Sequence, residues 1–370
     1  MKFNCDLETL SKAVSDVSLA ISSKSTIPAL EGVLLECSDQ KLLLTGYDLE
    51  IGITTTIPIF EEEPGSIVLN AQLLGEILKK MDAQTVFFET DEKMMTTIVG
   101  DNTRFHILGM EKEEYPALPE MEKENVFSIK DTSLKKMIYQ TLFCTSPNSN
   151  TPVLQGSLFE IKQNLLTVVS VDGYRVALCR EEIDFAKNLS FIVSAKALAE
   201  LSKLLQEQSE DETHIYVGKK HVTFHIGSCS MIARLIEGEF LNYTTAISSE
   251  HKTRIKADVK NFIQLIERVS IIINQKNKTP VKMEVSNNKM YLTCESTIGR
   301  VQDEQEIMLD GETLTIAFNN RYMLDALRHC EKEEVFIDFN GSLSPIQIVP
   351  IEDDSFLYLV LPVRMRGSDA

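Results

Sequence analysis

The chain has 370 residues, 43% of them hydrophobic, and carries a formal net charge of −18 at pH 7. This length exceeds one domain of ordinary size, so we expect two or three domains with separate hydrophobic cores. The acidic excess argues against a surface that is basic throughout, but leaves room for a local basic face. The N-terminal sequence MKFNCDLETL lacks the apolar run of a signal peptide, and no stretch approaches the roughly 18 apolar residues of a membrane span. We therefore expect a cytoplasmic protein.

One sequence pattern occurs three times along the chain. The segment TPVLQGSLFEIKQNLLTVVSVDGYRVA, at 151–177, has a degraded copy 124 residues upstream, IPALEGVLLECSDQKLLLTGYDLEIGI. A third copy begins at Pro280, which lies 128 residues beyond Pro152. Internal repeats of this length indicate consecutive domains of one fold. We predict three domains, at 1–121, 122–250 and 251–370.

Two amphipathic helices are predicted in each repeat. The first spans 7–22, where apolar residues recur at three- and four-residue steps, and its counterparts begin at Asp131 and Asp258. Asp131 can cap its helix, because a carboxylate at this position accepts hydrogen bonds from free backbone N–H groups. The second helix is expected at 71–80, 195–205 and 320–330.

The remaining segments of each repeat are short alternating runs separated by turn residues. Gly-Asp-Asn, Val-Gly-Lys-Lys and Asn-Gly lie between such runs, which is typical of β-hairpins and therefore of antiparallel sheets. The fold class is thus α+β, with two helices covering one face of a sheet in each of three repeated domains.

Basic residues recur at two aligned positions of the second helices. The aligned sets are Gln72, Lys196 and Arg321, then Lys79, Lys203 and Arg328 seven residues later, with the acids Glu76, Glu200 and Asp325 between them. Seven residues make two helical turns, so both sets lie on one face. This face is either a solvated surface with local ion pairs or a surface for a polyanion.

Catalytic motifs are missing from the sequence. It contains no GxxxxGK[ST], no GxGxxG after a strand, no GxSxG and no HExxH. His221 and His225 lie in an alternating run, and a strand holds residues four apart too far from each other to share a metal ion. The seven cysteines form no CxxC pair and are expected to be reduced core thiols. We expect neither a metal nor a cofactor, and an enzyme has only acidic runs such as Glu61–Glu63 in its favour.

Two segments carry residues that the repeat pattern leaves unexplained. In the second repeat, the turn pair Asp172-Gly173 is followed by Tyr174 and by Arg175, a charge at the start of an apolar strand that needs a partner. The C-terminal run FLYLVLPVRM is almost wholly apolar. It is either a core strand or the rim of a groove for a partner peptide.

The TIPALEG segment, VDGYRVA and the terminal LPVRM together resemble the β subunits of bacterial DNA polymerase III, the replication sliding clamps. The resemblance extends from residue 1 to the end of LPVRM at Met365. It implies that two chains of three clamp domains close head to tail into a ring, with helices lining the inside and antiparallel sheets outside. Such a ring encircles double-stranded DNA without sequence preference and tethers the polymerase, with no catalysis of its own, in the bacterial cytoplasm.

The resemblance also assigns residues to DNA. Those implied to face the duplex are Lys24, Lys79, Asn148, Lys196, Lys203, Arg321 and Arg328. Electrostatic contacts to phosphates suit sliding, because they hold DNA of any sequence without stopping the protein on it, whereas base contacts would fix it at one site.

A groove for partner peptides is implied by the same resemblance. Its residues are Leu154, Val171, Gly173, Tyr174, Arg175, Val176, Leu241, Thr245, Ala246, Val360, Leu361, Pro362, Val363, Arg364 and Met365. Aliphatic walls and one arginine can hold a short linear peptide by apolar anchors and fix its polar end. The chain departs from the family at Tyr174, where His is usual, at Leu241, where Pro is usual, and at Thr245, where a basic residue is common. Its tail, Arg366–Ala370, extends beyond the usual end.

The head-to-tail contact between two copies is implied to involve Phe105 of the first repeat with Ile271 and Ile272 of the third. The partners implied are a second copy, the replicative polymerase, the clamp loader and other proteins with a clamp-binding motif. From the residues alone, a three-domain peptide-binding scaffold unrelated to DNA is the alternative.

Overall fold

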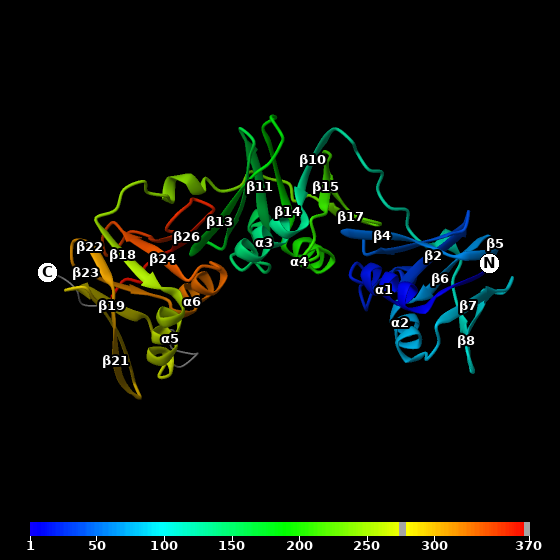
Figure 1. Cartoon of the computed structure of the whole chain (residues 1–370), viewed down its shortest axis with the longest axis horizontal. Helices are drawn as coiled ribbons and strands as arrows, with labels where there is room; N and C mark the ends of the chain where they lie inside the picture. The colour runs from blue at the N-terminus through cyan, green and yellow to red at the C-terminus, as the bar shows by residue number, and fades with distance from the viewer. Residues whose placement is uncertain (274–278, 366–370) are drawn as a thin grey trace. The chain divides into compact units, whose positions relative to one another are not determined.

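The computed structural model describes residues 1–273 and 279–365 (Figure 1). The tail Arg366–Ala370 therefore lies outside the described residues. The chain divides into two compact units, Met1–Lys135 with Lys196–Leu235, and Lys136–Ala195 with Ile236–Ala370. The boundary between the units falls inside the second repeat, so each unit combines a terminal repeat with part of the central one.

The α-helices of the described residues lie where the repeats predict them. The first helix of each repeat has 12 residues: α1 (Leu7–Ser18), α3 (Asp131–Leu142) and α5 (Val259–Ser270). The second has 10 residues: α2 (Ala71–Lys80), α4 (Ala195–Leu204) and α6 (Asn320–His329). The predicted extension of the first helix to residue 22 is wrong. The chain tightens after Ser18, where the N–H of Leu19 bonds to the carbonyl of Asp16, three residues back, and the α-helical ladder stops.

Side-chain caps explain where the helices begin. Asp6 Oδ1 accepts from the Thr9 N–H at 2.7 Å, Asn70 Oδ1 from Leu73 at 2.9 Å, and Asp258 Oδ1 from Asn261 at 2.7 Å. Each cap satisfies a backbone donor that has no partner within its helix.

The first unit contains two antiparallel sheets. One has the strand order β5-β1-β7-β8-β9, and the other β10-β15-β16-β17-β4-β3-β2-β6. The first sheet comprises β1 (Lys2–Asp6), β5 (Phe60–Glu63), β7 (Thr85–Thr90), β8 (Met95–Gly100) and β9 (Thr103–Leu108). The second comprises β2 (Gly32–Ser38), β3 (Lys41–Tyr47), β4 (Ile51–Pro58), β6 (Gly65–Asn70), β10 (Asn125–Lys130), β15 (Glu212–Val217), β16 (His221–Ile226) and β17 (Cys229–Arg234). The eight-stranded sheet is therefore shared by the first two repeats, which meet at the β4–β17 pair.

The second unit also contains two antiparallel sheets. Their strand orders are β14-β11-β12-β13-β26-β25-β24-β18-β22 and β21-β20-β19-β23. The larger sheet comprises β11 (Gly156–Lys162), β12 (Leu165–Val171), β13 (Arg175–Glu182), β14 (Leu189–Ser194), β18 (Thr253–Asp258), β22 (Met308–Gly311), β24 (Glu334–Phe339), β25 (Ile346–Val349) and β26 (Phe356–Val360). The smaller comprises β19 (Val281–Ser286), β20 (Lys289–Ser296), β21 (Gly299–Glu306) and β23 (Leu314–Phe318). Here the second and third repeats meet at the β13–β26 pair.

Helices pack on one face of these sheets. In the first repeat α1 lies against β3 and β4, and α2 against β2 and β6 (Figure 1). The contact is closest at Gly46, where a Cβ atom would come within 2.1 Å of the Val17 carbonyl oxygen, so only glycine fits. In the third repeat α5 packs against β18–β21. The helices thus turn their apolar stripes to the sheets and leave their polar faces outward.

The TIPALEG and TPVLQG segments form equivalent short 3₁₀-helices, η1 (Pro28–Glu31) and η3 (Pro152–Gln155), directly before β2 and β11. Two further 3₁₀-helices, η2 (Lys112–Glu114) and η4 (Tyr243–Ala246), follow the last strands of the first and second repeats. The prolines start each of the first pair, since their fixed φ suits the first helical position.

All seven cysteines are buried free thiols. Burial raises the pKa of Cys5, Cys179 and Cys229 to about 12 in each case, with smaller contributions from nearby charges. None of the helices that the structure describes is long and apolar enough to cross a membrane.

Candidate nucleic-acid and peptide interfaces

The residues predicted to face DNA are all exposed. Lys79 lies in the last turn of α2, Lys196 and Lys203 lie on α4, and Arg321 and Arg328 lie on α6. The other two occupy equivalent positions, since Lys24 precedes η1 and Asn148 precedes η3 by the same number of residues. The second helices therefore present basic side chains on their solvent-facing sides.

Acidic neighbours neutralise several of these cations. Lys196 Nζ lies 2.5 Å from Asp48 and 3.0 Å from Glu50, Lys203 pairs with Glu200 at 2.7 Å, and Arg328 pairs with Glu267 at 2.6 Å. Partial burial lowers the pKa of Lys196, but its hydrogen bonds to the two carboxylates outweigh this and raise it. Lys24, Lys79 and Arg321 make no ion pair with any residue in 1–273 or 279–365. The net positive charge that these side chains can present to DNA is therefore smaller than the number of basic residues suggests.

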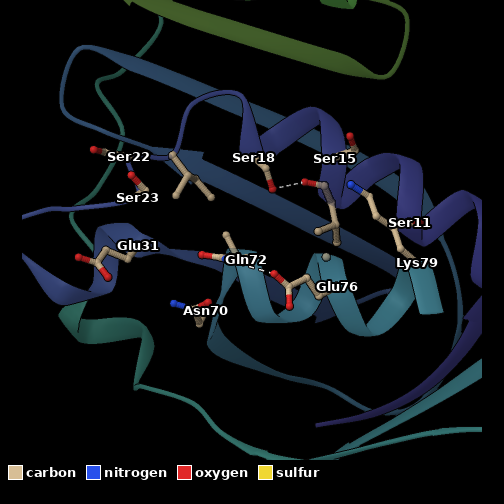
Figure 2. A pocket seen from close by; sticks show the side chains of 14 residues that line it. Ser11, Ser15, Ser18, Ser22, Ser23, Glu31, Asn70, Gln72, Glu76 and Lys79 are labelled. Atoms are coloured by element: carbon tan, nitrogen blue, oxygen red, sulfur yellow. Dashed lines mark hydrogen bonds between the residues drawn. The ribbon is translucent and has the colours of Figure 1, made fainter. Parts of the chain in front are cut away.

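A cleft of about 450 Å³ is lined by residues of both α1 and α2, two helices that also contact each other. Figure 2 shows Ser11, Ser15 and Ser18 along α1, facing Gln72, Glu76 and Lys79 on α2. Gln72 donates to Glu76 at 2.9 Å, and Ser18 Oγ donates to the Val14 carbonyl, so both are already engaged. The remaining hydroxyls beside Lys79 can donate to an anionic oxygen without adding charge.

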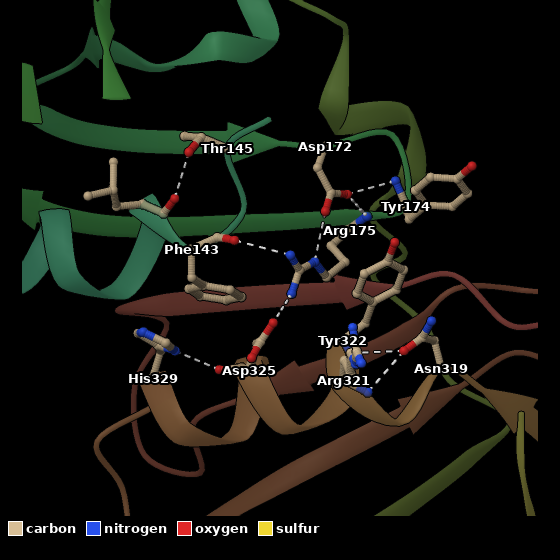
Figure 3. Close-up of polar contacts among 11 residues, drawn as sticks. Phe143, Thr145, Asp172, Tyr174, Arg175, Asn319, Arg321, Tyr322, Asp325 and His329 are labelled. Carbon is tan, nitrogen blue, oxygen red and sulfur yellow. Dashed lines mark hydrogen bonds and ion pairs between the residues drawn. The ribbon is translucent and has the colours of Figure 1, made fainter. Parts of the chain in front are cut away.

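Arg175 is the most heavily engaged side chain of the predicted peptide site. Only 8% of it is exposed, and it donates from Nε to Asp172 at 2.9 Å, from Nη1 to Asp325 at 2.6 Å and from Nη2 to the Phe143 carbonyl at 3.1 Å (Figure 3). Arg175, the charged residue at the start of an apolar strand, thus has two acidic partners that the sequence alone did not identify.

Aromatic rings surround this guanidinium. Its carbon lies 4.4 Å from the centre of the Tyr322 ring and 5.5 Å from that of Phe143. Tyr174, which is 59% exposed, stacks on Tyr322 with ring centres 5.8 Å apart (Figure 3). Cation–π and stacking contacts therefore join β13 and its preceding turn to α6.

The structure brings many of the predicted peptide-site residues together. Leu154, Val171 and Val176 pack in one apolar cluster, which also includes Phe240 and Tyr243 from the segment beside Leu241, Thr245 and Ala246. After β26 the chain stays close: the N–H of Leu361 donates to the Tyr174 carbonyl at 3.0 Å, Pro362 bridges to Phe318, and the N–H of Val363 donates to the Ala317 carbonyl at 2.7 Å.

These residues differ in what they offer to a partner. Gly173, Tyr174, Leu241, Thr245, Ala246, Leu361 and Arg364 are exposed, and Leu154, Val176, Pro362, Val363 and Met365 are half-buried. The remaining three, Val171, Arg175 and Val360, are buried. Gly173 has a φ of 88°, which glycine adopts without strain in this turn.

The residues predicted for the contact between copies lie at the edges of the two units. Phe105 is half-buried on β9, an edge strand of its sheet. Ile271 follows the end of α5 and is 79% exposed, whereas Ile272 packs in part against the core of the third repeat. A single exposed apolar side chain is ordinary on a protein surface, so the exposure of Ile271 does not by itself mark a contact with another chain.

Sequence reasoning missed the partners of Arg175. Asp325 was seen only as one of three aligned helix acids, and Tyr322 and Phe143 were not singled out. A signal did exist, because a charge at the start of an apolar strand requires an acid from elsewhere in the chain. Glu200 does pair within its helix and Glu76 accepts from Gln72, but Asp325 pairs with another repeat.

Among the described residues no group of His, Cys, Asp and Glu is arranged to hold a metal ion. The fold and these surfaces define a class: three repeated α+β domains with paired helices and shared antiparallel sheets. Family models of the DNA polymerase III beta subunit match the N-terminal domain at residues 1–119, the central domain at 128–242 and the C-terminal domain at 244–364.

Individual relatives agree with these matches. The chain is 33% identical to the beta sliding clamp of Bacillus subtilis, over 98% of this chain and 100% of that one, and 30% identical to that of Staphylococcus aureus, over 98% and 99%. The crystal structure of the Bacillus subtilis clamp superposes with a TM-score of 0.95 at 32% identity, covering 99% of each chain. The crystal structure of the Pseudomonas aeruginosa clamp bound to griselimycin also superposes with a TM-score of 0.95. It is 26% identical and covers 99% of this chain and 100% of that one.

The chain belongs to the family of DNA polymerase III β subunits. It consists of three clamp domains, and its role is that of a sliding clamp, a processivity factor that is not itself an enzyme.

Proposed function

We propose that two copies of this chain pair head to tail into a closed ring that encircles double-stranded DNA and tethers the replicative polymerase to it. The domains of the ring are 1–121, 122–250 and 251–370, and it works in the bacterial cytoplasm. The observation that carries the proposal is the way in which consecutive repeats join.

Both joints within the chain follow one plan. At the first, β4 of the first repeat pairs with β17, the last strand of the second, with Ile51 opposite Ala233. At the second, β13 pairs with β26, the last strand of the third repeat, with Arg175 opposite Val360. The strand of the third repeat that corresponds to β4 and β13 is β21, and the last strand of the first repeat is β9. Each of these is an edge strand of its sheet, so a third joint would form if β21 of one copy paired with β9 of another. Edge strands with free backbone groups are templates for pairing with another chain, and a second copy supplies the matching edge.

The same equivalence supports the predicted apolar contact. Tyr358, the third residue of β26, lies edge-on to Phe143, the first residue after α3, with ring centres 5.5 Å apart. Phe105 is the third residue of β9, and Ile271 is the first residue after α5. In the proposed dimer Phe105 of one copy would therefore meet Ile271 of the other, with Ile272 beside it.

The helices supply the surface for DNA. We place Lys24, Lys79, Asn148, Lys196, Lys203, Arg321 and Arg328 toward the duplex, with the acids that pair with Lys196, Lys203 and Arg328 keeping the attraction weak. Weak contacts to phosphates hold DNA of any sequence and permit movement along it.

Retention on DNA tests the ring. Protein loaded on nicked circular DNA stays bound through gel filtration at high salt, and leaves when the circle is cut once. Retention on the linear form would contradict a topological link. At low salt, where contacts to phosphates contribute, the triple variant Lys79, Lys203 and Arg328 to Glu separates the ring from a peptide scaffold unrelated to DNA, since it lowers retention on DNA and spares peptide binding.

We further propose that the surface around Leu154, Tyr174, Leu241 and Leu361 binds the polymerase, the clamp loader and other partners through short peptides with apolar anchors. Support comes from the cluster of Leu154, Val171 and Val176 beside exposed Tyr174, Leu241 and Leu361. The variant Leu154→Arg should abolish binding of a polymerase-derived peptide with Leu and Phe anchors while the dimer persists. Unchanged affinity would remove Leu154 from the site.

A further inference from the structure

The two joints share a turn as well as a strand pair. In the first repeat Asp48 Oδ1 accepts from the N–H groups of Glu50 and Ile51, at 3.0 and 2.8 Å. In the second repeat the equivalent Asp172 Oδ1 accepts from Tyr174 and Arg175, at 2.9 and 2.8 Å. The same aspartate therefore shapes the chain just before the joining strand in both repeats.

Each turn is also tied by an ion pair to the second helix of the following repeat, with opposite polarity. At the first joint the turn supplies the acids, Asp48 and Glu50, and α4 supplies Lys196, which is half exposed. At the second joint the turn supplies Arg175, and α6 supplies Asp325. Each tie has one side chain that is at most 9% exposed, Asp48 at the first joint and Arg175 at the second, and it is the arginine that is buried at the predicted peptide site.

The arginine of this tie offers little to a ligand, because only 8% of it is exposed and three of its five N–H groups already have partners. Nε, Nη1 and Nη2 each have a partner within 3.1 Å, and the guanidinium plane lies over Tyr322. A peptide carboxylate would have to reach a side chain that is almost wholly buried, and it would add a third negative charge to a guanidinium already paired with Asp172 and Asp325. Its burial and its two acidic partners therefore favour a role inside the protein over the expected role of fixing the polar end of a peptide.

We infer that Arg175 is a positioning residue, which through Asp325 holds α6 against the turn and so fixes Tyr322 beneath Tyr174 as an aromatic face for apolar peptides. The inference rests on the proposed peptide site and deepens it. Tyr322 is held from two sides, by the guanidinium of Arg175 at 4.4 Å and by the Tyr174 ring at 5.8 Å, while Asn319 caps the start of its helix. Recognition at this end is then aromatic and independent of an acidic residue in the peptide.

The variant Asp325→Asn tests this tie with a matched control. It removes one charge and leaves Arg175 its bonds to Asp172 and Phe143, so the fold has the means to survive. The control is Glu200→Gln, at the aligned position of α4, where the acid pairs only with Lys203 of its own helix. Asp325→Glu keeps the charge and should restore binding. Peptide affinity is measured by fluorescence anisotropy with the Leu and Phe anchor peptide, and thermal unfolding is followed in parallel.

A spectroscopic readout separates positioning from general destabilisation. The chain has nine tyrosines and no tryptophan, so 3-fluorotyrosine labelling gives few ¹⁹F signals, and Tyr174→Phe and Tyr322→Phe assign the two that matter. In Asp325→Asn we expect the Tyr174 and Tyr322 signals to shift and the others to stay. Peptide affinity should fall about tenfold, the scale of one charge-assisted hydrogen bond. Glu200→Gln should match the wild type in both.

The outcomes are distinct. If Asp325→Asn binds the peptide as the wild type does, while Leu154→Arg does not bind, the role of the tie is overturned and the peptide site stands. If the wild-type protein itself fails to bind, the proposed peptide site falls and this inference falls with it. A peptide with an acidic residue that binds much more tightly than its amide counterpart would also overturn the inference, because it would give Arg175 a direct role.

Discussion

Replacing Ile271 by alanine tests the proposed contact between two copies. The change removes three carbon groups, each worth about 0.8 kcal/mol when fully buried. Because 79% of Ile271 is exposed in the single chain, covering it would account for about 1.9 kcal/mol per contact. A head-to-tail dimer contains two such contacts, so about 3.8 kcal/mol of association free energy is lost, which raises the dimer Kd roughly 500-fold.

Sedimentation velocity over a dilution series measures this change directly. Leu343→Ala is the matched control, because Leu343 is 67% exposed, loses the same number of carbon groups and lies in the turn between β24 and β25, outside the proposed contact. We expect its dimer to dissociate at the wild-type concentration. If Ile271→Ala dissociates no more readily than Leu343→Ala, Ile271 does not lie in the interface and the argument from the repeated joints is refuted.

Three further predictions follow from other parts of the chain. The buried cysteine thiols should resist alkylation at pH 8 and should all react on unfolding, since burial holds several pKa values near 12; a fast-reacting thiol in the native protein contradicts this. Gly46→Ala should cost about 3 kcal/mol of unfolding free energy by urea titration, because its Cβ meets Val17, whereas Gly75→Ala, with open space around it, should gain about 0.5 kcal/mol; equal effects would refute the close contact. Glu267→Gln frees Arg328 and should steepen the salt dependence of binding to short linear duplex, by up to about 0.9 per additional phosphate contact; an unchanged slope would show that the freed Arg328 makes no contact with phosphate.

The repeated fold was predictable because the chain repeats its apolar positions. Leu10, Leu134 and Phe262 align across the three first helices, and all three are fully buried. The spacing of apolar residues and the capping residues predict where such helices begin, because both depend only on residues a few positions apart in the sequence. The end of α1 was less certain, because the apolar pattern continues to Ile21 although the hydrogen-bond ladder stops at Ser18.

The contacts between repeats were not predictable in the same way. Alignment placed Asp325 with Glu76 and Glu200, and a helical period tells which side of α6 an acid occupies, not which residue of another repeat lies opposite. The partner of Asp325 depends on where β13 begins in space. The one sign in the sequence of the contact between Arg175 and Asp325 was the presence of a charged residue at the start of an apolar strand.

The strand pairs at the joints decide what can be cut from this protein. The central repeat has its own helices and hairpins, yet β17 needs β4 and β13 needs β26 to cover their edges. Excised at 122–250, it would carry two open, largely apolar edges and would be prone to aggregate. A continuous fragment that keeps both β4 and β26 runs from Ile51 to Val360, nearly the whole chain, so the central repeat cannot be separated from its neighbours for crystallisation or domain exchange.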